Sequence, residues 1–157
     1  MVTAKSPIQP IPHFKDAVRM ADPTSRDASS LHLLVIDDDV DAAEAVAGLL
    51  ELQGHRPALV HDGLEVLEAA RWFGPDAIVM DLGLPGINGY EAAALVRQER
   101  ALDEVLLIAL TGWGTEAHKR ASTDAGFDLH LTKPVTFDGL RKALARVEPH
   151  QTGVSTI

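Results

Sequence analysis

Five polar residues, from four separate parts of the chain, each stand where an apolar run ends. They are Asp37, Asp38, Asp81, Thr111 and Lys133. Because a parallel α/β sheet gathers the carboxyl ends of its strands along one edge, we expect these side chains to meet in one pocket. Clustered carboxylates raise one another's pKa unless something positive lies between them, and Mg²⁺ prefers oxygen ligands. The pattern therefore predicts a site for a divalent cation and a phosphoryl group.

Asp81 is followed by a loop that would keep a carboxylate accessible. In the string AIVMDLGLPGINGYE, Pro85, Gly86 and Gly89 predict a tight turn above the sheet. The backbone carbonyl of Gly83 could serve as a metal ligand. A carboxylate can attack a phosphoryl group and form an acyl phosphate, so Asp81 is the candidate nucleophile.

Thr111 and Lys133 suit the oxygens of a transferred phosphoryl group. The hydroxyl can donate a hydrogen bond and the ammonium can supply positive charge, which is what phosphoryl transfer requires of a protein. A cis bond before Pro134 would aim Lys133 inward. Each residue also has an ordinary structural interpretation, as a strand end or a surface Lys-Pro pair. Asp39 is the expected cap of the first helix.

From Leu31 onward, short apolar runs alternate with segments of helical period. The expected strands are 31–36, 57–60, 76–80, 104–110 and 128–132, and the expected helices are 40–54, 64–74, 89–100, 115–125 and 137–147. Five strand-helix units in a row predict an α/β fold, a doubly wound five-stranded parallel sheet with helices on both faces. Residues 1–30 are expected to be a flexible extension, with a short helix near Phe14 and Val18, and residues 148–157 a tail.

Composition narrows the class of protein. With 157 residues and 46% hydrophobic composition, one domain is expected. The net charge of −9 argues against a broad nucleic-acid interface. The chain has no cysteine, which excludes disulfides and thiolate chemistry, and no apolar run approaches the roughly 18 residues that span a bilayer. We expect a cytoplasmic protein without a nucleic-acid or membrane partner.

The strings VIDDD, AIVMDLGLPGINGYE, LIALTG and HLTKPV, in this order, resemble the receiver domain of two-component response regulators. The resemblance covers residues 31–147, and ALTGWG and AGFDLHLTKPV are closest in wording to the receivers of hybrid sensor kinases. It implies a flavodoxin-like fold and a phosphorelay module, not a turnover enzyme, that signals to an unidentified downstream protein. It also implies phosphorylation of Asp81 by a histidine kinase or a histidine phosphotransfer protein. The implied Mg²⁺ ligands are Asp38, Asp81 and the carbonyl of Gly83, assisted by Asp37, and the residues implied to contact the phosphoryl group are Thr111 and Lys133.

Two residues depart from the family pattern. His130 stands where the family has the Tyr or Phe that moves inward when the threonine engages the phosphoryl group, and burying an imidazole costs more than burying a phenyl ring. Trp113 lies just beyond Thr111. We expect Trp113 and Gly83 together to govern how water reaches an acyl phosphate on Asp81.

Two other classes of protein share parts of this pattern. Phosphatases of the haloacid dehalogenase type need a second Asp two residues after the nucleophile, and that position is Gly83. Turnover of a generic phosphate ester would favour them. Flavin-binding modules need a phosphate cradle of backbone N–H groups after the first strand, where this chain is acidic. Flavin absorbance of the purified protein would favour that class.

Overall fold

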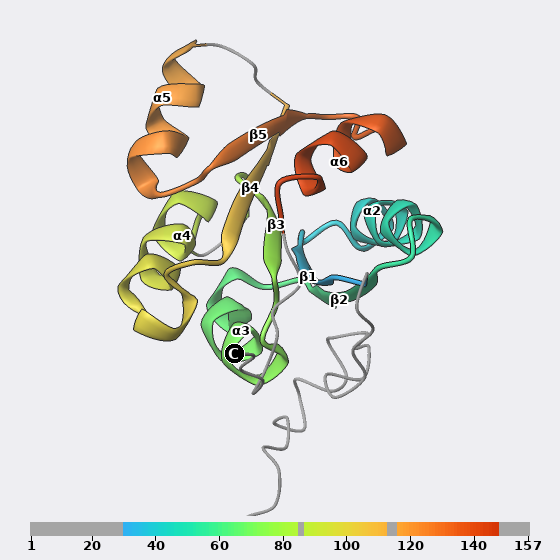
Figure 1. Cartoon of the computed structure of the whole chain (residues 1–157). Coiled ribbons are helices and arrows are strands. Elements are labelled where there is room, and N and C mark those ends of the chain that lie inside the picture. Colours follow the sequence, from blue (N-terminus) through green and yellow to red (C-terminus); the bar gives the residue numbers. More distant parts are fainter. Residues whose placement is uncertain (1–29, 85–86, 113–115, 148–157) are drawn as a thin grey trace, which may run out of the picture.

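The computed structural model describes residues 30–84, 87–112 and 116–147. Ten helices and strands alternate along these residues (Figure 1). They are β1 (His32–Ile36), α2 (Val40–Leu52), β2 (Arg56–Val60), α3 (Val66–Phe73), β3 (Ala77–Asp81), α4 (Gly89–Gln98), β4 (Leu106–Thr111), α5 (Glu116–Ala125), β5 (Leu129–Thr132) and α6 (Phe137–Leu144). Two short 3₁₀ turns, η1 (Gly63–Glu65) and η2 (Arg100–Leu102), precede α3 and follow α4.

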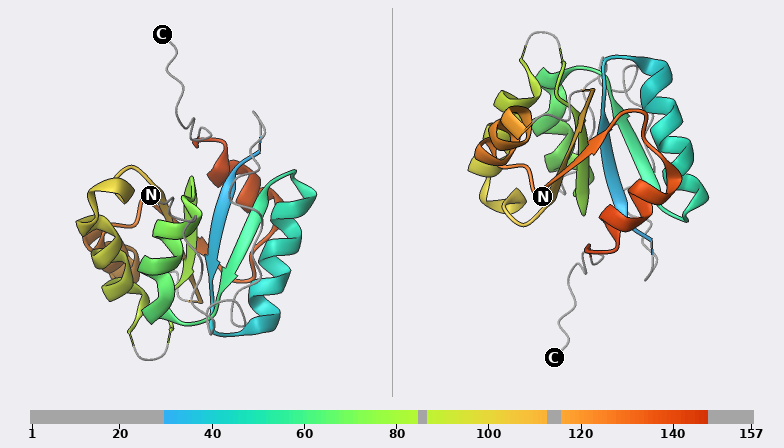
Figure 2. Two further views of the ribbon diagram at one scale, coloured as in Figure 1. Left: turned by 90° about the horizontal axis from the view of Figure 1, so that it is seen from below. Right: turned by 90° about the horizontal axis from the view of Figure 1, so that it is seen from above.

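The strands form one parallel sheet in the order β2-β1-β3-β4-β5. Figure 2 shows α2 and α6 on one face of the sheet, and α3, α4 and α5 on the other. The predicted doubly wound, flavodoxin-like sheet is therefore confirmed. In this order β1 and β3 are neighbours at the point where the chain direction across the sheet reverses, which is where ligands of such sheets bind.

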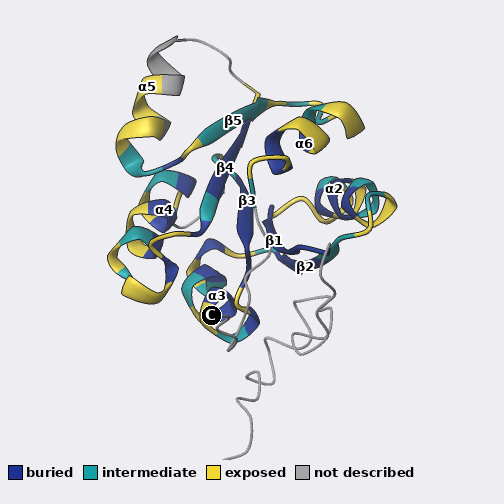
Figure 3. Cartoon of the chain, viewed as in Figure 1, coloured by how far each residue is buried: buried dark blue, intermediate teal, exposed yellow. Residues whose placement is uncertain are grey.

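Alternate residues of each strand face opposite layers, and both layers are apolar. Ile36, Met80 and Ala109 pack with α3 and α4, whereas Val35, Val79 and Leu110 pack with α2 and α6. Strands β1 to β4 are mostly dark blue in Figure 3 because almost all of their residues are buried, whereas the edge strand β5 is mostly half-buried and teal. Strand β4 is buried from Leu107 to Thr111, as predicted for a central parallel strand.

Helix ends follow the expected capping chemistry. The side chain of Asp39 accepts a hydrogen bond from the N–H of Ala42 at 3.2 Å, which confirms it as the cap of α2. Gly54, Gly74 and Gly126 have φ angles of 89°, 64° and 112° just after α2, α3 and α5. Those left-handed conformations explain why glycine ends each helix.

Several predicted boundaries were wrong by a few residues. The segment predicted as a helix from residue 64 starts as the turn η1, because the side chain of Asp62 accepts the N–H of Leu64 at 2.9 Å. The helix predicted to end at residue 100 ends at Gln98, and the last helix ends at Leu144. The expected short helix near Phe14 and the tail after residue 147 lie outside the described residues.

Candidate functional site

Three carboxylates meet at the carboxyl edge of the sheet. Asp37 and Asp38 follow β1, and Asp81 ends the neighbouring strand β3. Oxygen atoms of the three side chains lie within 4.8 Å of one another. Asp37 has only 1% of its side chain exposed and Asp81 has 13%, whereas Asp38 is exposed to solvent. The cluster is thus buried on the side of Asp37 and open to solvent on the side of Asp38.

Lys133 places an ammonium group against this cluster. Its Nζ lies 3.3 Å from Oδ1 of Asp81 and 3.4 Å from Oδ2 of Asp37. The peptide bond between Lys133 and Pro134 is cis, as the sequence analysis suggested. Four of the five residues of the predicted pocket therefore lie together: Asp37, Asp38, Asp81 and Lys133.

The charges of this cluster shift one another's protonation. Burial raises the pKa of Asp37, and the charge of Asp81 raises it further, against the opposing effects of the Asp39 N–H and of Lys133. For Lys133, burial lowers the pKa, but Asp37 and Asp81 together more than offset burial, so the pKa is raised. Lys133 is therefore charged at neutral pH, and ionised Asp37 lacks the solvation that an exposed carboxylate has.

The loop after β3 holds the Asp81 carboxylate through its own backbone. The N–H of Gly83 donates to Oδ1 of Asp81 at 3.1 Å, and the N–H of Leu82 donates to the carbonyl of Leu110 at 3.1 Å. A Cβ on Gly89 would come within 2.8 Å of the Cα of Leu82, so glycine is required where α4 begins. Pro85 and Gly86, predicted to tighten this loop, lie outside the described residues.

Thr111 lies on β4, the neighbour of β3, and His130 lies on β5, the next strand outward. Thr111 ends β4 and is 4% exposed, and its carbonyl accepts the N–H of Lys133 at 2.9 Å. His130 is half-buried and pairs with Ala109. Because alternate residues of a strand share a face, His130 and Thr111 lie on the same face of the sheet. Trp113 lies outside the described residues.

One residue near the cluster was missed by sequence reasoning. The ring of His61, directly after β2, has its Nδ1 3.0 Å from the carbonyl oxygen of Asp37. The available signal was its position, because His61 is also a polar residue at the end of an apolar strand, and β2 is next to β1 in the sheet.

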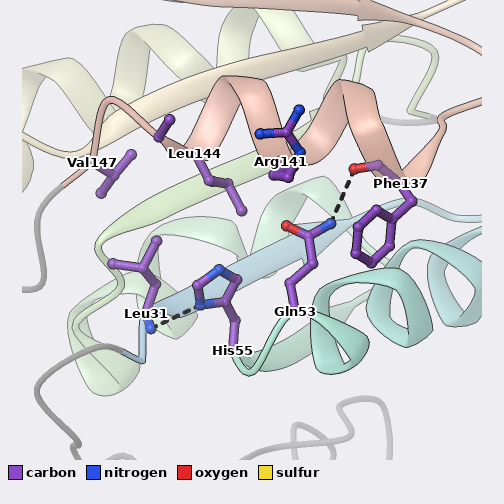
Figure 4. A pocket seen from close by; sticks show the side chains of 8 residues that line it. Leu31, Gln53, His55, Phe137, Arg141, Leu144 and Val147 are labelled. Atoms are coloured by element: carbon purple, nitrogen blue, oxygen red, sulfur yellow. Dashed lines mark hydrogen bonds between the residues drawn. The ribbon is translucent and has the colours of Figure 1, made fainter.

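Two hollows lie in the surface on the side of α2 and α6. An apolar hollow of about 210 Å³ adjoins the cluster and is lined in part by Val46, Leu49 and Pro134. A more open pocket of about 470 Å³ lies between α6 and the end of α2 (Figure 4). In this pocket His55 and Leu31 face α6. Leu31 directly precedes β1, so the pocket lies at the amino end of that strand. The second pocket therefore contains none of the predicted site residues.

Comparison with known proteins agrees with this geometry. The family model of the response regulator receiver domain matches residues 33–145, so the chain belongs to the response regulator receiver family of two-component systems. The transcriptional regulatory protein TcrA of Mycobacterium tuberculosis is 36% identical over 124 residues, which are 77% of this chain and 48% of TcrA. The chain thus spans about half the length of the curated relatives it matches.

Two solved structures share this fold with the chain. The receiver domain of a sensor histidine kinase from Pseudomonas aeruginosa, with magnesium coordinated in its active-site cleft, is 29% identical, covers 75% of this chain and 97% of its own, and has a TM-score of 0.70. The chemotaxis protein CheY4 of Vibrio cholerae is 26% identical, covers 76% and 99%, and has a TM-score of 0.72. Among the described residues, no helix is long and apolar enough to cross a membrane.

Proposed function

We propose that residues 31–147 act as a phosphoacceptor receiver module, in which Asp81 takes a phosphoryl group. The observation that carries this proposal is the convergence at one sheet edge. Three carboxylates have oxygens within 4.8 Å of one another, and the ammonium of Lys133 lies 3.3 Å from Asp81. Such a cluster opposes folding through repulsion and desolvation, which favours a role in chemistry over a role in stability.

The donor set fits Mg²⁺. Asp38, Asp81 and the backbone carbonyl of Gly83 would hold the ion, with Asp37 assisting, since carboxylate and carbonyl oxygens are its preferred protein ligands. The exposed Asp38 borders the open side of the cluster, where water and phosphate oxygens can complete a coordination shell. When bound, the ion would offset negative charge on the carboxylates and on the transferred oxygens.

The proposed reaction moves one phosphoryl group from a phosphohistidine to Asp81. A carboxylate oxygen of Asp81 forms a bond to phosphorus while the phosphorus–nitrogen bond breaks, and the departing imidazole takes the bonding electron pair and a proton from water. The Lys133 ammonium supplies positive charge beside the attacking carboxylate. The hydroxyl of Thr111 donates a hydrogen bond to a phosphoryl oxygen, and half-exposed His130 moves with it on the same face of the sheet.

The phosphodonor in this proposal is a histidine kinase or a histidine phosphotransfer protein. The apolar hollow between α2 and Pro134 supports a protein donor, because it adjoins Lys133 and offers apolar contact area beside the reacting group. Phosphorylation would then shift the equilibrium of the α5, β5 and α6 face and so change its affinity for an unidentified downstream protein. The proposal includes no nucleic-acid partner and no membrane partner, and the module is not a turnover enzyme in it.

A mass measurement tests the proposed function. The protein is incubated with acetyl phosphate and Mg²⁺, and its intact mass is compared with those of Asp81→Asn and of Asp41→Asn, a control on the exposed start of α2. The parent and the control should gain one phosphoryl group, and Asp81→Asn should gain none. Removal of Mg²⁺ with a chelator should suppress the gain. A gain that persists in Asp81→Asn would refute Asp81 as the acceptor.

A further inference from the structure

His61 lies beside the acid cluster, at the point where β1 and β2 end together. The last backbone bond between these strands runs from the N–H of Asp37 to the carbonyl of Val60, at 3.1 Å. One residue further on, Nδ1 of His61 lies 3.0 Å from the carbonyl oxygen of Asp37. A carbonyl oxygen can only accept, so Nδ1 of His61 must carry the proton in this contact.

This hydrogen bond fixes the peptide group that joins Asp37 to Asp38. The following peptide group is held as well, because the N–H of Asp39 donates to Oδ1 of Asp37 at 3.0 Å. Asp38 is therefore attached to the protein through two peptide groups that are each tied in place. Its side chain is exposed, so packing does little to orient it, and the backbone sets the direction of the Cα–Cβ bond from which its carboxylate extends.

The backbone around His61 is itself tied to the loop that follows Asp81. The turn η1 begins two residues later, and a Cβ on Gly63 would lie 2.8 Å from both Cγ2 and the carbonyl oxygen of Ile87. The N–H of Leu64 is also bound by the side chain of Asp62 at 2.9 Å. His61 thus links the end of β1 to a turn that packs closely on the loop after β3.

We propose that His61 is a positioning residue of the metal site: its Nδ1–H holds the Asp37–Asp38 peptide and so aims the Asp38 carboxylate at the ion. This inference rests on the proposed function, because it assumes that the acid cluster binds Mg²⁺. It adds a residue from a third strand to the site, and that residue touches neither the ion nor the phosphoryl group.

Mg²⁺ affinity tests the inference, measured by calorimetric titration of the full chain. His61→Leu removes the donor, whereas His61→Asn keeps an amide N–H close to the place of Nδ1. We expect His61→Leu to bind Mg²⁺ about tenfold more weakly, at the lower end of losses for outer-shell partners, and His61→Asn to bind within about twofold of the parent. His55→Asn is the matched control at the other end of β2, and Asp38→Asn is the reference for a lost ligand.

Unfolding in urea without metal separates positioning from general stability. A positioning role predicts that the loss of Mg²⁺ affinity in His61→Leu exceeds any change in its metal-free stability, and that Asn restores the affinity. Parent-like affinity in His61→Leu, with affinity lost in Asp38→Asn, would overturn this inference alone. A parent that binds no Mg²⁺ would overturn the metal site of the proposed function as well.

A measurement on the unmodified protein gives an independent test, should a variant fail to fold. Nitrogen-15 chemical shifts report which ring nitrogen of a histidine carries the proton. For neutral His61 we expect the proton on Nδ1. A neutral ring with its proton on Nε2 would contradict the hydrogen bond to Asp37 and with it the proposed role.

Discussion

At the scale of single residues, Asp37 shows how the site opposes the stability of the fold. Its carboxylate is 1% exposed and faces Asp81, and its pKa is raised because burial and then that neighbouring charge disfavour the ionised form. In a group with a raised pKa, the folded state binds the proton more tightly. The free energy of unfolding therefore falls as pH rises through the pKa of Asp37 and stays lower at neutral pH.

Asp37→Asn should consequently stabilise the metal-free protein at pH 7. Removing the charge removes the desolvation cost, while the Asn oxygen can still accept the N–H of Asp39. We expect the Tm to rise by about 2–5 °C, the size of shift that about 1 kcal/mol gives in a domain of this length. Thermal unfolding with a chelator present measures it. A lower Tm for the variant would show that the ion pair with Lys133 outweighs the cost.

Gly83 is the residue-scale test of how water reaches an acyl phosphate. Among the described residues, a Cβ at this position would meet only Oδ1 of Asp81, at 3.8 Å, and the φ angle of Gly83 is not positive, so a larger residue can be accommodated. Gly83→Leu should lengthen the lifetime of the phosphorylated protein several-fold by covering the carboxylate. Decay of the phosphorylated mass measures this lifetime. Gly48→Ala, in the middle of α2, is the control, and equal lifetimes in all three proteins would contradict the idea.

The residues of the pocket could be predicted because strand ends are visible as ends of apolar runs. Asp37, Asp38, Asp81 and Lys133 do come together as that reasoning required. His61 was missed although it obeys the same rule, since its role depends on a backbone carbonyl, which leaves no mark in the sequence. The placement of Thr111 was predictable from its strand, whereas the switch role of His130 stays a prediction.

At the scale of elements, Arg97 connects α4 to the segments that lead into β4 and β5. Its guanidinium donates to the carbonyls of Gly126 at 3.0 Å and Val105 at 2.8 Å, and to the carboxylate of Asp128 at 2.6 Å. That carboxylate also accepts the N–H of Leu107, where β4 begins, at 2.9 Å. Arg97 thus joins the end of α4 to the beginnings of β4 and β5.

Arg97→Leu should destabilise the fold by about 2–3 kcal/mol, because it leaves several carbonyls and a carboxylate without their charged donor. Urea unfolding measures this loss. Arg71→Gln is the matched control, since its ion pair with Glu99 is exposed at the surface and such pairs contribute little. Equal losses in the two variants would mean that Arg97 is an ordinary surface cation.

His55 gives the fold a defined response to pH. Its Nδ1 accepts the N–H of Leu31 at 3.1 Å, and burial lowers its pKa against the opposing charge of Asp76. Below about pH 6.5 the unfolded chain therefore binds a proton that the folded protein resists, so stability falls as pH falls. His55→Asn keeps an acceptor and should lose less stability than the parent between pH 7 and pH 5.5. Identical pH profiles of urea unfolding would exclude His55 as a cause.

The order and type of the elements followed from apolar periodicity, whereas their ends depended on side-chain hydrogen bonds. Asp62 accepts the N–H of Leu64 and turns a predicted helical start into η1. Asp128, predicted to open the last strand, instead uses its carboxylate to hold Leu107 and Arg97. The contact of Asp62 is local and those of Asp128 join residues that are remote in sequence, but all of them depend on side-chain hydrogen bonds, which apolar periodicity does not record.

At the scale of the whole molecule, chemistry and stability are placed at opposite edges of one sheet. The acid cluster occupies the carboxyl edge of the sheet. The hydrogen bonds of the Arg97 guanidinium and the hydrogen bond of His55 lie toward the amino edge. A site that opposes folding is thereby carried on two apolar layers that support it. Because of this division, we expect substitutions in the pocket to leave the domain folded.

The site of phosphorylation is the central claim, and chemical trapping tests it most directly. An acyl phosphate on aspartate is reduced by borohydride to homoserine, which tandem mass spectrometry locates within a peptide. After treatment of the full chain with acetyl phosphate and Mg²⁺, we predict homoserine at position 81 and at no other carboxylate. Homoserine at position 37 or 38, or a phosphorylated protein without any homoserine, would contradict the account.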